Sequence, residues 1–346
     1  MNSKQRVYGA IRRTAIDRTP RFLWFHPSLL DEFGRRFGTS GFATEAAIGN
    51  DILQPWVSIN QSMARAAAEG ASFTDDFGIT WTRQGYYNMV TRHPLMDAGL
   101  GQIEYYRMPD PHDPGRFTEL EQLLASFGND HFIGADVSGS IFEPAYHLRG
   151  MEDLLVEMTL REPEAGALLD KTMRFTTSAA LESMRRGVDW VWLGDDVGTQ
   201  SGMLISPLVW REILKPRLKT IVDAIHSVAP GTIIAYHSCG SIRPIIGDLA
   251  EIGIDVLNPL QPMATDMDNA AIKREFGNTL TFMAGIDTQD FLVSAKPEQA
   301  RAETRRIVEV MGGNGGFIFA GSHTIQPDVP MANIEAMLET LDNQTI

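Results

Sequence analysis

Short apolar runs rich in β-branched and aromatic residues recur along the chain, separated by longer stretches with apolar residues three and four positions apart. The first pattern predicts buried strands and the second predicts amphipathic helices, so their alternation favours parallel strands joined by crossover helices. Seven runs are clear, at residues 21–26, 131–137, 188–194, 232–238, 254–260, 280–286 and 316–322, and residues 51–59 supply a plausible eighth.

Eight such strands predict a (β/α)8 TIM barrel, and we interpret the whole chain, residues 1–346, as a single barrel domain. Residues 74–94 alternate in the manner of an antiparallel ribbon, so a hairpin-like insertion is expected in the N-terminal part. Helices are expected at residues 207–228 and 294–312, the second ending at Gly312 and Gly313.

Polar or reactive residues follow the clear runs, at or just past the end of each one. In a barrel of this type the carboxyl ends of the strands and the loops after them carry the functional side chains. We therefore expect one group at the barrel mouth: His26, Glu143, the pair Asp195 and Asp196, His237 with Cys239, Gln261, Asp287, and Ser322 with His323.

The only cysteine of the chain lies two positions after a histidine, in the stretch IIAYHSCGSI at residues 233–242. Residues two apart in a strand point to the same face, so Ile233, Ala235, His237 and Cys239 should share one face. If that face lines the barrel, an imidazole and a thiol meet at its mouth, which is the start of a zinc site. The alternative is a small buried cysteine beside a hydrogen-bonded histidine.

The carboxylates allow two interpretations each. Asp195 and Asp196 follow an apolar strand, so one should point into the mouth and the other away. Either aspartate could serve as a metal ligand, as a base or as the acceptor that orients a metal-bound histidine, or it could instead cap a helix. Asp75 and Asp76 are expected to organise the hairpin.

The remaining candidates are assigned to substrate binding. His26 is a candidate substrate contact or part of a turn. Gln261 is a candidate pocket-lining amide or a loop cap between two prolines. Asp287 completes this group of three.

Composition narrows the possible partners. The hydrophobic content is 43% and no apolar run reaches the length of a membrane span, so no membrane partner is expected. A net charge of -14 disfavours nucleic acid, because binding would gain nothing from counterion release. The N-terminal stretch does not look like a secretory signal, and one cysteine permits no internal disulfide, so a cytoplasmic location is expected.

Four blocks of the sequence together resemble the uroporphyrinogen decarboxylase superfamily. They are KQRVYGAIRRTAIDRTPRF, GDDVGTQSGMLISPLVWREILKP, HSCGSIRPIIGDLAEIGIDVLNPLQP and GGFIFAGSHTIQPDVPMANIEAMLETL. The resemblance implies a (β/α)8 barrel in agreement with the pattern above. It also implies one of two activities: metal-free decarboxylation, or zinc-dependent methyl transfer between a corrinoid protein and a thiol or other acceptor.

Two features favour the methyltransferase branch. Decarboxylases of the superfamily carry an arginine-rich segment after the first strand, and this chain has FHPSLLDEFGRRFG there. The methyltransferases carry H-x-C-G, which is present here as His237, Cys239 and Gly240. Their third zinc ligand is commonly a second cysteine from the last strand; here the matching place holds Ser322 and His323, so the resemblance implies His323 as the ligand. Glu143 resembles a position near the metal and is a candidate fourth ligand.

The expectation is therefore a zinc methyltransferase that acts on a small methoxy, methylthio or methylamine-type substrate, or on a thiol acceptor. It would work with a corrinoid (cobalamin) carried by a partner protein, in a demethylase half-reaction. The alternative on the same fold is a decarboxylase or lyase in which Asp195 or Asp196 protonates a carbanion-like intermediate. A third alternative is a metal-binding or cofactor-carrier protein without turnover.

Overall fold

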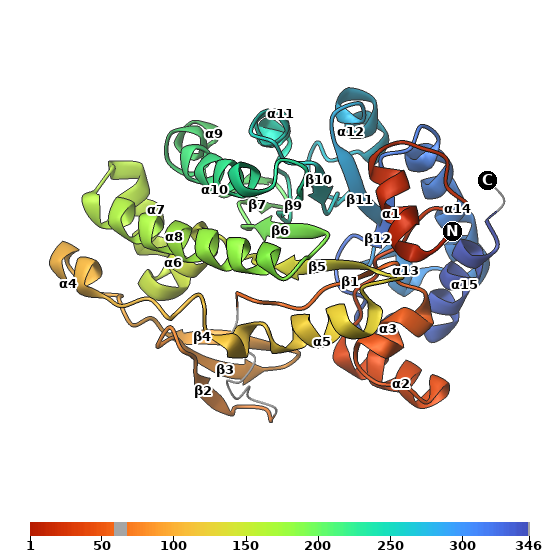
Figure 1. Cartoon of the computed structure of the whole chain (residues 1–346), viewed down its shortest axis with the longest axis horizontal. Coiled ribbons are helices and arrows are strands. Elements are labelled where there is room, and N and C mark those ends of the chain that lie inside the picture. Colours follow the sequence, from red (N-terminus) through yellow and green to blue (C-terminus); the bar gives the residue numbers. More distant parts are fainter. Residues whose placement is uncertain (59–67, 345–346) are drawn as a thin grey trace.

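The computed structural model describes residues 1–58 and 68–344, and its centre is a curved sheet of parallel strands (Figure 1). The strand order is β1-β5-β6-β9-β10-β11-β12. The bounds are Ile52–Leu53 (β1), Phe132–Asp136 (β5), Trp190–Gly194 (β6), Ile233–His237 (β9), Val256–Asn258 (β10), Thr281–Ile286 (β11) and Phe317–Gly321 (β12).

Residues 21–25 close this sheet into a barrel. Arg21 forms a parallel bridge with Phe319, and Phe25 forms one with Ile325. On the other side, the Asp51 N–H donates to the Arg21 carbonyl at 2.9 Å, just before β1. The predicted (β/α)8 barrel is thus confirmed, including the plausible eighth run, of which residue 59 lies outside the described residues.

Side chains along the strands point alternately into two buried clusters. One buried cluster lies inside the barrel and includes Phe22, Trp190, Trp192, Ile233 and Ala235. Ile234 and Tyr236 belong to the other cluster, which packs beneath the helices. This separation confirms the predicted alternation along β9, and it places the next residue of the inner face, His237, at the top of the barrel interior.

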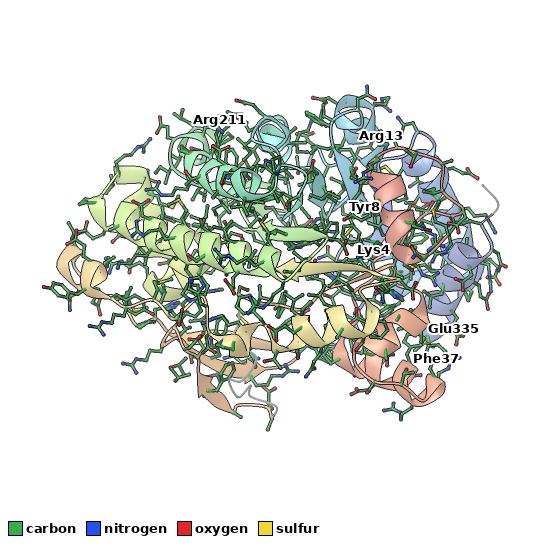
Figure 2. All side chains as sticks on the ribbon, in the orientation of Figure 1. Lys4, Tyr8, Arg13, Phe37, Arg211 and Glu335 are labelled. Carbon is green, nitrogen blue, oxygen red and sulfur yellow. The ribbon has the colours of Figure 1, made fainter. Side chains whose placement is uncertain are left out.

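Helix α1 (Ser3–Ile11) covers the amino-terminal end of the strands, since its Val7 belongs to the inner cluster. The Lys4 ammonium group lies 3.0 Å from the Asp189 carboxylate, and the Tyr8 hydroxyl donates to the same carboxylate at 3.0 Å (Figure 2). The opposite end, where the strands finish, is left for the loops that carry the candidate site residues.

The other helices lie outside the sheet (Figure 1). Their bounds are Pro27–Phe37 (α2), Phe42–Ile48 (α3), Leu100–Tyr105 (α4), Thr118–Phe127 (α5), Phe142–Arg149 (α6), Met151–Leu160 (α7), Pro163–Arg185 (α8), Pro207–Val209 (α9), Lys215–Val228 (α10), Ile246–Glu251 (α11), Asn269–Phe276 (α12), Phe291–Ser294 (α13), Pro297–Gly312 (α14) and Met331–Asp342 (α15). In the described part of the chain, no helix combines the length and apolarity needed to cross a membrane.

The two helices predicted from spacing are present, with different extents. The helix expected at 294–312 is α14, which begins only at Pro297 because Ser294 ends α13. The stretch predicted as one helix at 207–228 is divided by a π-helical turn, Trp210–Leu214, into α9 and α10. Pro216 follows this turn and cannot donate the backbone hydrogen bond that a regular α-helix needs there, which accounts for the local widening.

The predicted antiparallel ribbon is a three-stranded sheet of β2 (Ser72–Thr74), β3 (Thr80–Gln84) and β4 (Tyr87–Arg92). It touches segments that follow three different barrel strands. The Tyr86 ring lies 4.9 Å from that of His26, the Gln326 amide donates to the Tyr87 hydroxyl at 2.6 Å, and the Trp81 ring lies 5.0 Å from that of His147. A second small ribbon joins β7 (Gly198–Thr199) and β8 (Gly202–Met203).

Candidate metal centre

His237, the last residue of β9, is held by the neighbouring strand. Asn258 of β10 is its register partner, and the Asn258 Oδ1 lies 2.7 Å from the His237 Nδ1. The Asn258 Nδ2 donates to the Met283 carbonyl at 3.2 Å, so the amide oxygen is the atom that faces the ring. The oxygen can only accept, so the proton of a neutral His237 sits on Nδ1, and the lone pair of Nε2 is free for a ligand.

Cys239 lies just beyond the end of β9, beside that nitrogen. Its Sγ is 3.4 Å from the His237 Nε2, and its backbone N–H donates to the Asp196 Oδ1 at 2.7 Å. The next residue, Gly240, has a φ of 77°, and a Cβ there would lie 2.7 Å from backbone atoms of Thr199. A tight turn therefore follows Cys239. Burial and the negative charge of Asp196 raise the pKa of the Cys239 thiol in the metal-free protein.

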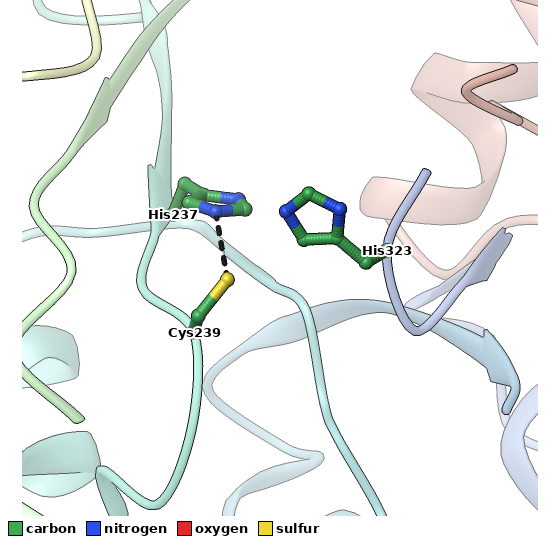
Figure 3. A group of neighbouring side chains, drawn as sticks. All are labelled: His237, Cys239 and His323. Carbon is green, nitrogen blue, oxygen red and sulfur yellow. Dashed lines mark hydrogen bonds between the residues drawn. The ribbon is translucent and has the colours of Figure 1, made fainter. Parts of the chain in front are cut away.

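His323 reaches the same point from the far side of the mouth, in the loop after β12 (Figure 3). The ligand atoms of His237, Cys239 and His323 all lie within 4.8 Å of one another. Burial, and then the nearby His237, lower the pKa of His323 from 6.5 to about 4, so this imidazole is neutral at neutral pH. The structure therefore brings together the three residues predicted as zinc ligands.

Trp24, on the segment that closes the barrel, lies beneath both histidines. Its ring centroid is 5.6 Å from that of His237 and 6.2 Å from that of His323. The ring centroid of Trp192 lies 5.6 Å from that of Trp24. Trp24 and His323 also line a narrow hollow together with Met283, whereas a wider groove between α14 and α15 contains none of the site residues.

The adjacent aspartates after β6 point in different directions, as expected. Asp195 is buried and accepts the backbone N–H groups of Ile141, Phe142 and Glu143, at 2.9 to 3.1 Å, at the start of α6. Burial raises its pKa to about 7. These contacts favour the helix-capping alternative for Asp195. Asp196 faces the donor set, with its Oδ1 3.6 Å from the His237 Nε2.

Glu143 occupies the first turn of α6, next to the two aspartates. Burial, and then the negative charges of Asp196 and Asp195, raise its pKa well above the ordinary value. The Tyr146 hydroxyl lies 3.5 Å from the Glu143 Oε1. These surroundings favour the protonated form of the Glu143 carboxyl group, and in that form it can donate a hydrogen bond.

The three residues predicted to bind substrate have different surroundings. Gln261 is 6% exposed and bonds to loop backbone, and Asp287 accepts the N–H groups of Asp290 and Phe291 at the start of α13. Those contacts favour structural roles for both. His26 caps the start of α2 by accepting from the Ser28 N–H, and its ring contacts Tyr86 of the hairpin. A contact between His26 and substrate stays a prediction.

Asn258 and Trp24 were not predicted from the sequence. A signal existed for Asn258, because a polar residue ending the strand next to an H-x-C strand is placed to bond the histidine. Trp24 looked like an ordinary core tryptophan. Asp75 and Asp76 do organise the hairpin: the Asp75 carboxylate accepts from the Trp81 indole at 2.7 Å, and Asp76 pairs with Arg116.

A family model described as uroporphyrinogen decarboxylase (URO-D) matches residues 101–344. The chain belongs to this family. A uroporphyrinogen decarboxylase of Magnetococcus marinus is 24% identical over 364 aligned positions, covering 99% of this chain and 98% of that protein. A methylcobamide:CoM methyltransferase of Methanosarcina barkeri is 25% identical over 180 residues, covering 51% of this chain and 49% of its own.

Other URO-D relatives and one solved structure complete the comparison. A decarboxylase of Chlorobium phaeobacteroides is 25% identical over 194 residues, covering 55% of this chain and 52% of that protein. The chain thus spans about half the length of the first curated relatives it matches. A methyltransferase structure from Methanosarcina mazei covers 99% of this chain and 98% of its own, with a TM-score of 0.74 and 18% identity, which shows a shared fold. Enzymes of both named activities are therefore among the relatives.

Proposed function

We propose that the protein is a zinc-dependent methyltransferase. It would move a methyl group between a small methylated substrate, or a thiol acceptor, and a corrinoid carried by a partner protein. The observation that most supports the proposal is the meeting of the His237, Cys239 and His323 ligand atoms within 4.8 Å at the carboxyl end of the barrel.

The residues present fit a zinc ion. Imidazole nitrogen and thiolate sulfur are ligands that zinc prefers, and three protein ligands with one open position are typical of catalytic zinc. His237 presents Nε2 because Asn258 accepts from its Nδ1–H, and the low pKa of His323 leaves its ring neutral for binding. When bound, zinc supplies a Lewis acid that polarises the heteroatom bearing the methyl group or lowers the pKa of an acceptor thiol.

Glu143 offers the proton that such a reaction needs at the heteroatom. Burial, and then the negative charges of Asp196 and Asp195, raise the pKa of this carboxyl group and so favour its protonated form. A protonated carboxyl can donate through its O–H to the oxygen, nitrogen or sulfur from which the methyl group departs. Asp196 accepts from the Cys239 backbone N–H and so holds the thiol beside His237.

The decarboxylase alternative is the competing function, because one relative that aligns over nearly its whole length carries that name. Decarboxylation of a tetrapyrrole carboxylate needs cations at the mouth to bind the substrate. The two arginines that follow the first strand here lie in the last turn of α2, where Arg36 pairs with the exposed Glu335. The charged groups that act on Cys239 are instead acidic, Asp196 and Glu143, and this favours the methyltransferase.

The proposal is tested by metal analysis followed by three assays. Protein purified without added metal is expected to contain about one zinc per chain, since the three donors form one ligand set. The protein is then offered methylcobalamin with thiols, cob(I)alamin with methoxylated or methylated small molecules, and uroporphyrinogen. Methyl transfer that depends on zinc in either corrinoid assay supports the proposal. Zinc-independent turnover of uroporphyrinogen, with no methyl transfer, overturns it.

Matched histidine variants sharpen the test. His323→Ala should lose zinc and methyl transfer, whereas His112→Ala should lose neither, because His112 is exposed and lies beside Glu182 on the surface. Zinc retained in full by His323→Ala would move the third ligand elsewhere, with Glu143 and Asp196 as the next candidates.

A further inference from the structure

The side chain of Gln261, in the loop after β10, joins loops that follow other strands of the barrel. Its Oε1 accepts the Gly240 backbone N–H at 2.8 Å and the Gln200 amide at 3.3 Å. Its Nε2 donates to the Ser322 carbonyl at 3.3 Å. Gln261 is 6% exposed, so these bonds form away from water, where an unpaired polar group is costly.

The backbone groups that bond to the Gln261 amide belong to residues adjacent in sequence to two candidate zinc ligands. Gly240 follows Cys239, and Ser322 precedes His323. These ligands come from β9 and β12, which are separated in the sheet by β10 and β11. The ladders of the sheet connect β9 to β12 only through β10 and β11, so the side chain of Gln261 adds a direct link between the two loops across the mouth.

We propose that Gln261 is a positioning residue that sets the distance between Cys239 and His323. Its amide is suited to this task, since one end must accept from an N–H while the other must donate to a carbonyl. The shorter amide of asparagine cannot reach both partners. The effect of this distance on zinc affinity rests on the proposed function. Its effect on the position of the Cys239 loop does not.

The test uses the full chain with Gln261→Asn, which keeps the amide on a shorter side chain, and Gln261→Met, which keeps the length but makes none of the three bonds. The first measurement is the alkylation rate of the metal-free protein by iodoacetamide at fixed pH, which reports on Cys239 alone because it is the only cysteine. Both variants are expected to react about five-fold faster, as the loss of one hydrogen bond would loosen the loop.

The second measurement is zinc affinity by competition with a chelator, together with the visible spectrum of the cobalt-substituted protein. Affinity is expected to fall about ten-fold to hundred-fold, the usual effect of losing support for a metal ligand. The control is Asn333→Leu, which removes a buried amide that donates to the Leu292 and Ala295 carbonyls and touches neither ligand loop. It should change neither measurement.

An unchanged alkylation rate in both Gln261 variants overturns the inference, whether or not the protein binds zinc. An equal rise in the Asn333→Leu control also overturns it, because the effect would then be general loosening. If the rate rises in the Gln261 variants alone but wild-type protein binds no zinc, the proposed function fails while the positioning role of Gln261 stands.

Discussion

The replacement Asn258→Leu tests whether His237 is oriented for metal binding. Asn258 is 3% exposed, accepts from the His237 Nδ1 at 2.7 Å and donates to the Met283 carbonyl at 3.2 Å. Leucine has similar size but makes neither bond, so the ring no longer has a fixed tautomer. Loss of such support costs about 10- to 100-fold in metal affinity, or about 1.4 to 2.8 kcal/mol.

The same replacement also affects stability, because it leaves two buried polar groups without partners. Each such group costs about 1–3 kcal/mol. Unfolding in denaturant with the metal chelated measures that part separately, and chelator competition on the folded protein measures zinc affinity. Asn258→Asp is the control, since a carboxylate still accepts from the Nδ1–H and should preserve affinity. Wild-type zinc affinity in Asn258→Leu would refute the reasoning.

Three further predictions concern the site and its surroundings. Cys239→Ala should lose zinc while the far-ultraviolet circular dichroism stays unchanged, because residues at strand ends serve function more than folding; a folded variant with full zinc content would contradict this. Gly240→Ala should lower the thermal midpoint and the zinc content together, since its φ of 77° is unfavourable for alanine and its Cβ would meet Thr199; a midpoint equal to that of wild type would exclude the clash. Burial lowers the pKa of His147 to about 4 from 6.5, so the unfolded chain takes up its proton first and stability falls as pH drops from about 6.5 to 4. His147→Phe, which keeps a ring against Trp81, should therefore unfold at lower pH than wild type in an acid titration, and an unchanged midpoint would count against the assigned pKa.

The barrel, His237 and Cys239 could be predicted because they depend on local pattern, whereas His323 was assigned through the resemblance to the family. Alternation along β9 was enough to place His237 inside, and the H-x-C spacing put Cys239 beside it. The division of the helix at 207–228 was missed because apolar spacing continues through the π-helical turn, and only the backbone requirement of Pro216 interrupts it.

The roles of individual polar residues depended on partners that are distant in the sequence. Asp195 and Asp196 are adjacent, yet only the fold shows that the N–H groups of residues 141–143 surround Asp195. Gln261 has the same amide whether it meets a substrate or a backbone, and its partners Gly240 and Ser322 come from other strands. A single sequence cannot reveal such pairings.

The URO-D family model covers the donor set but not the hairpin of β2, β3 and β4. His237, Cys239 and His323 all lie inside the region matched by the URO-D model, residues 101–344, whereas the hairpin precedes it. The hairpin contacts the mouth through side chains such as those of Tyr86 and Tyr87. A change at Tyr86 or Tyr87 would therefore alter the edge of the mouth without replacing any of the three donor residues.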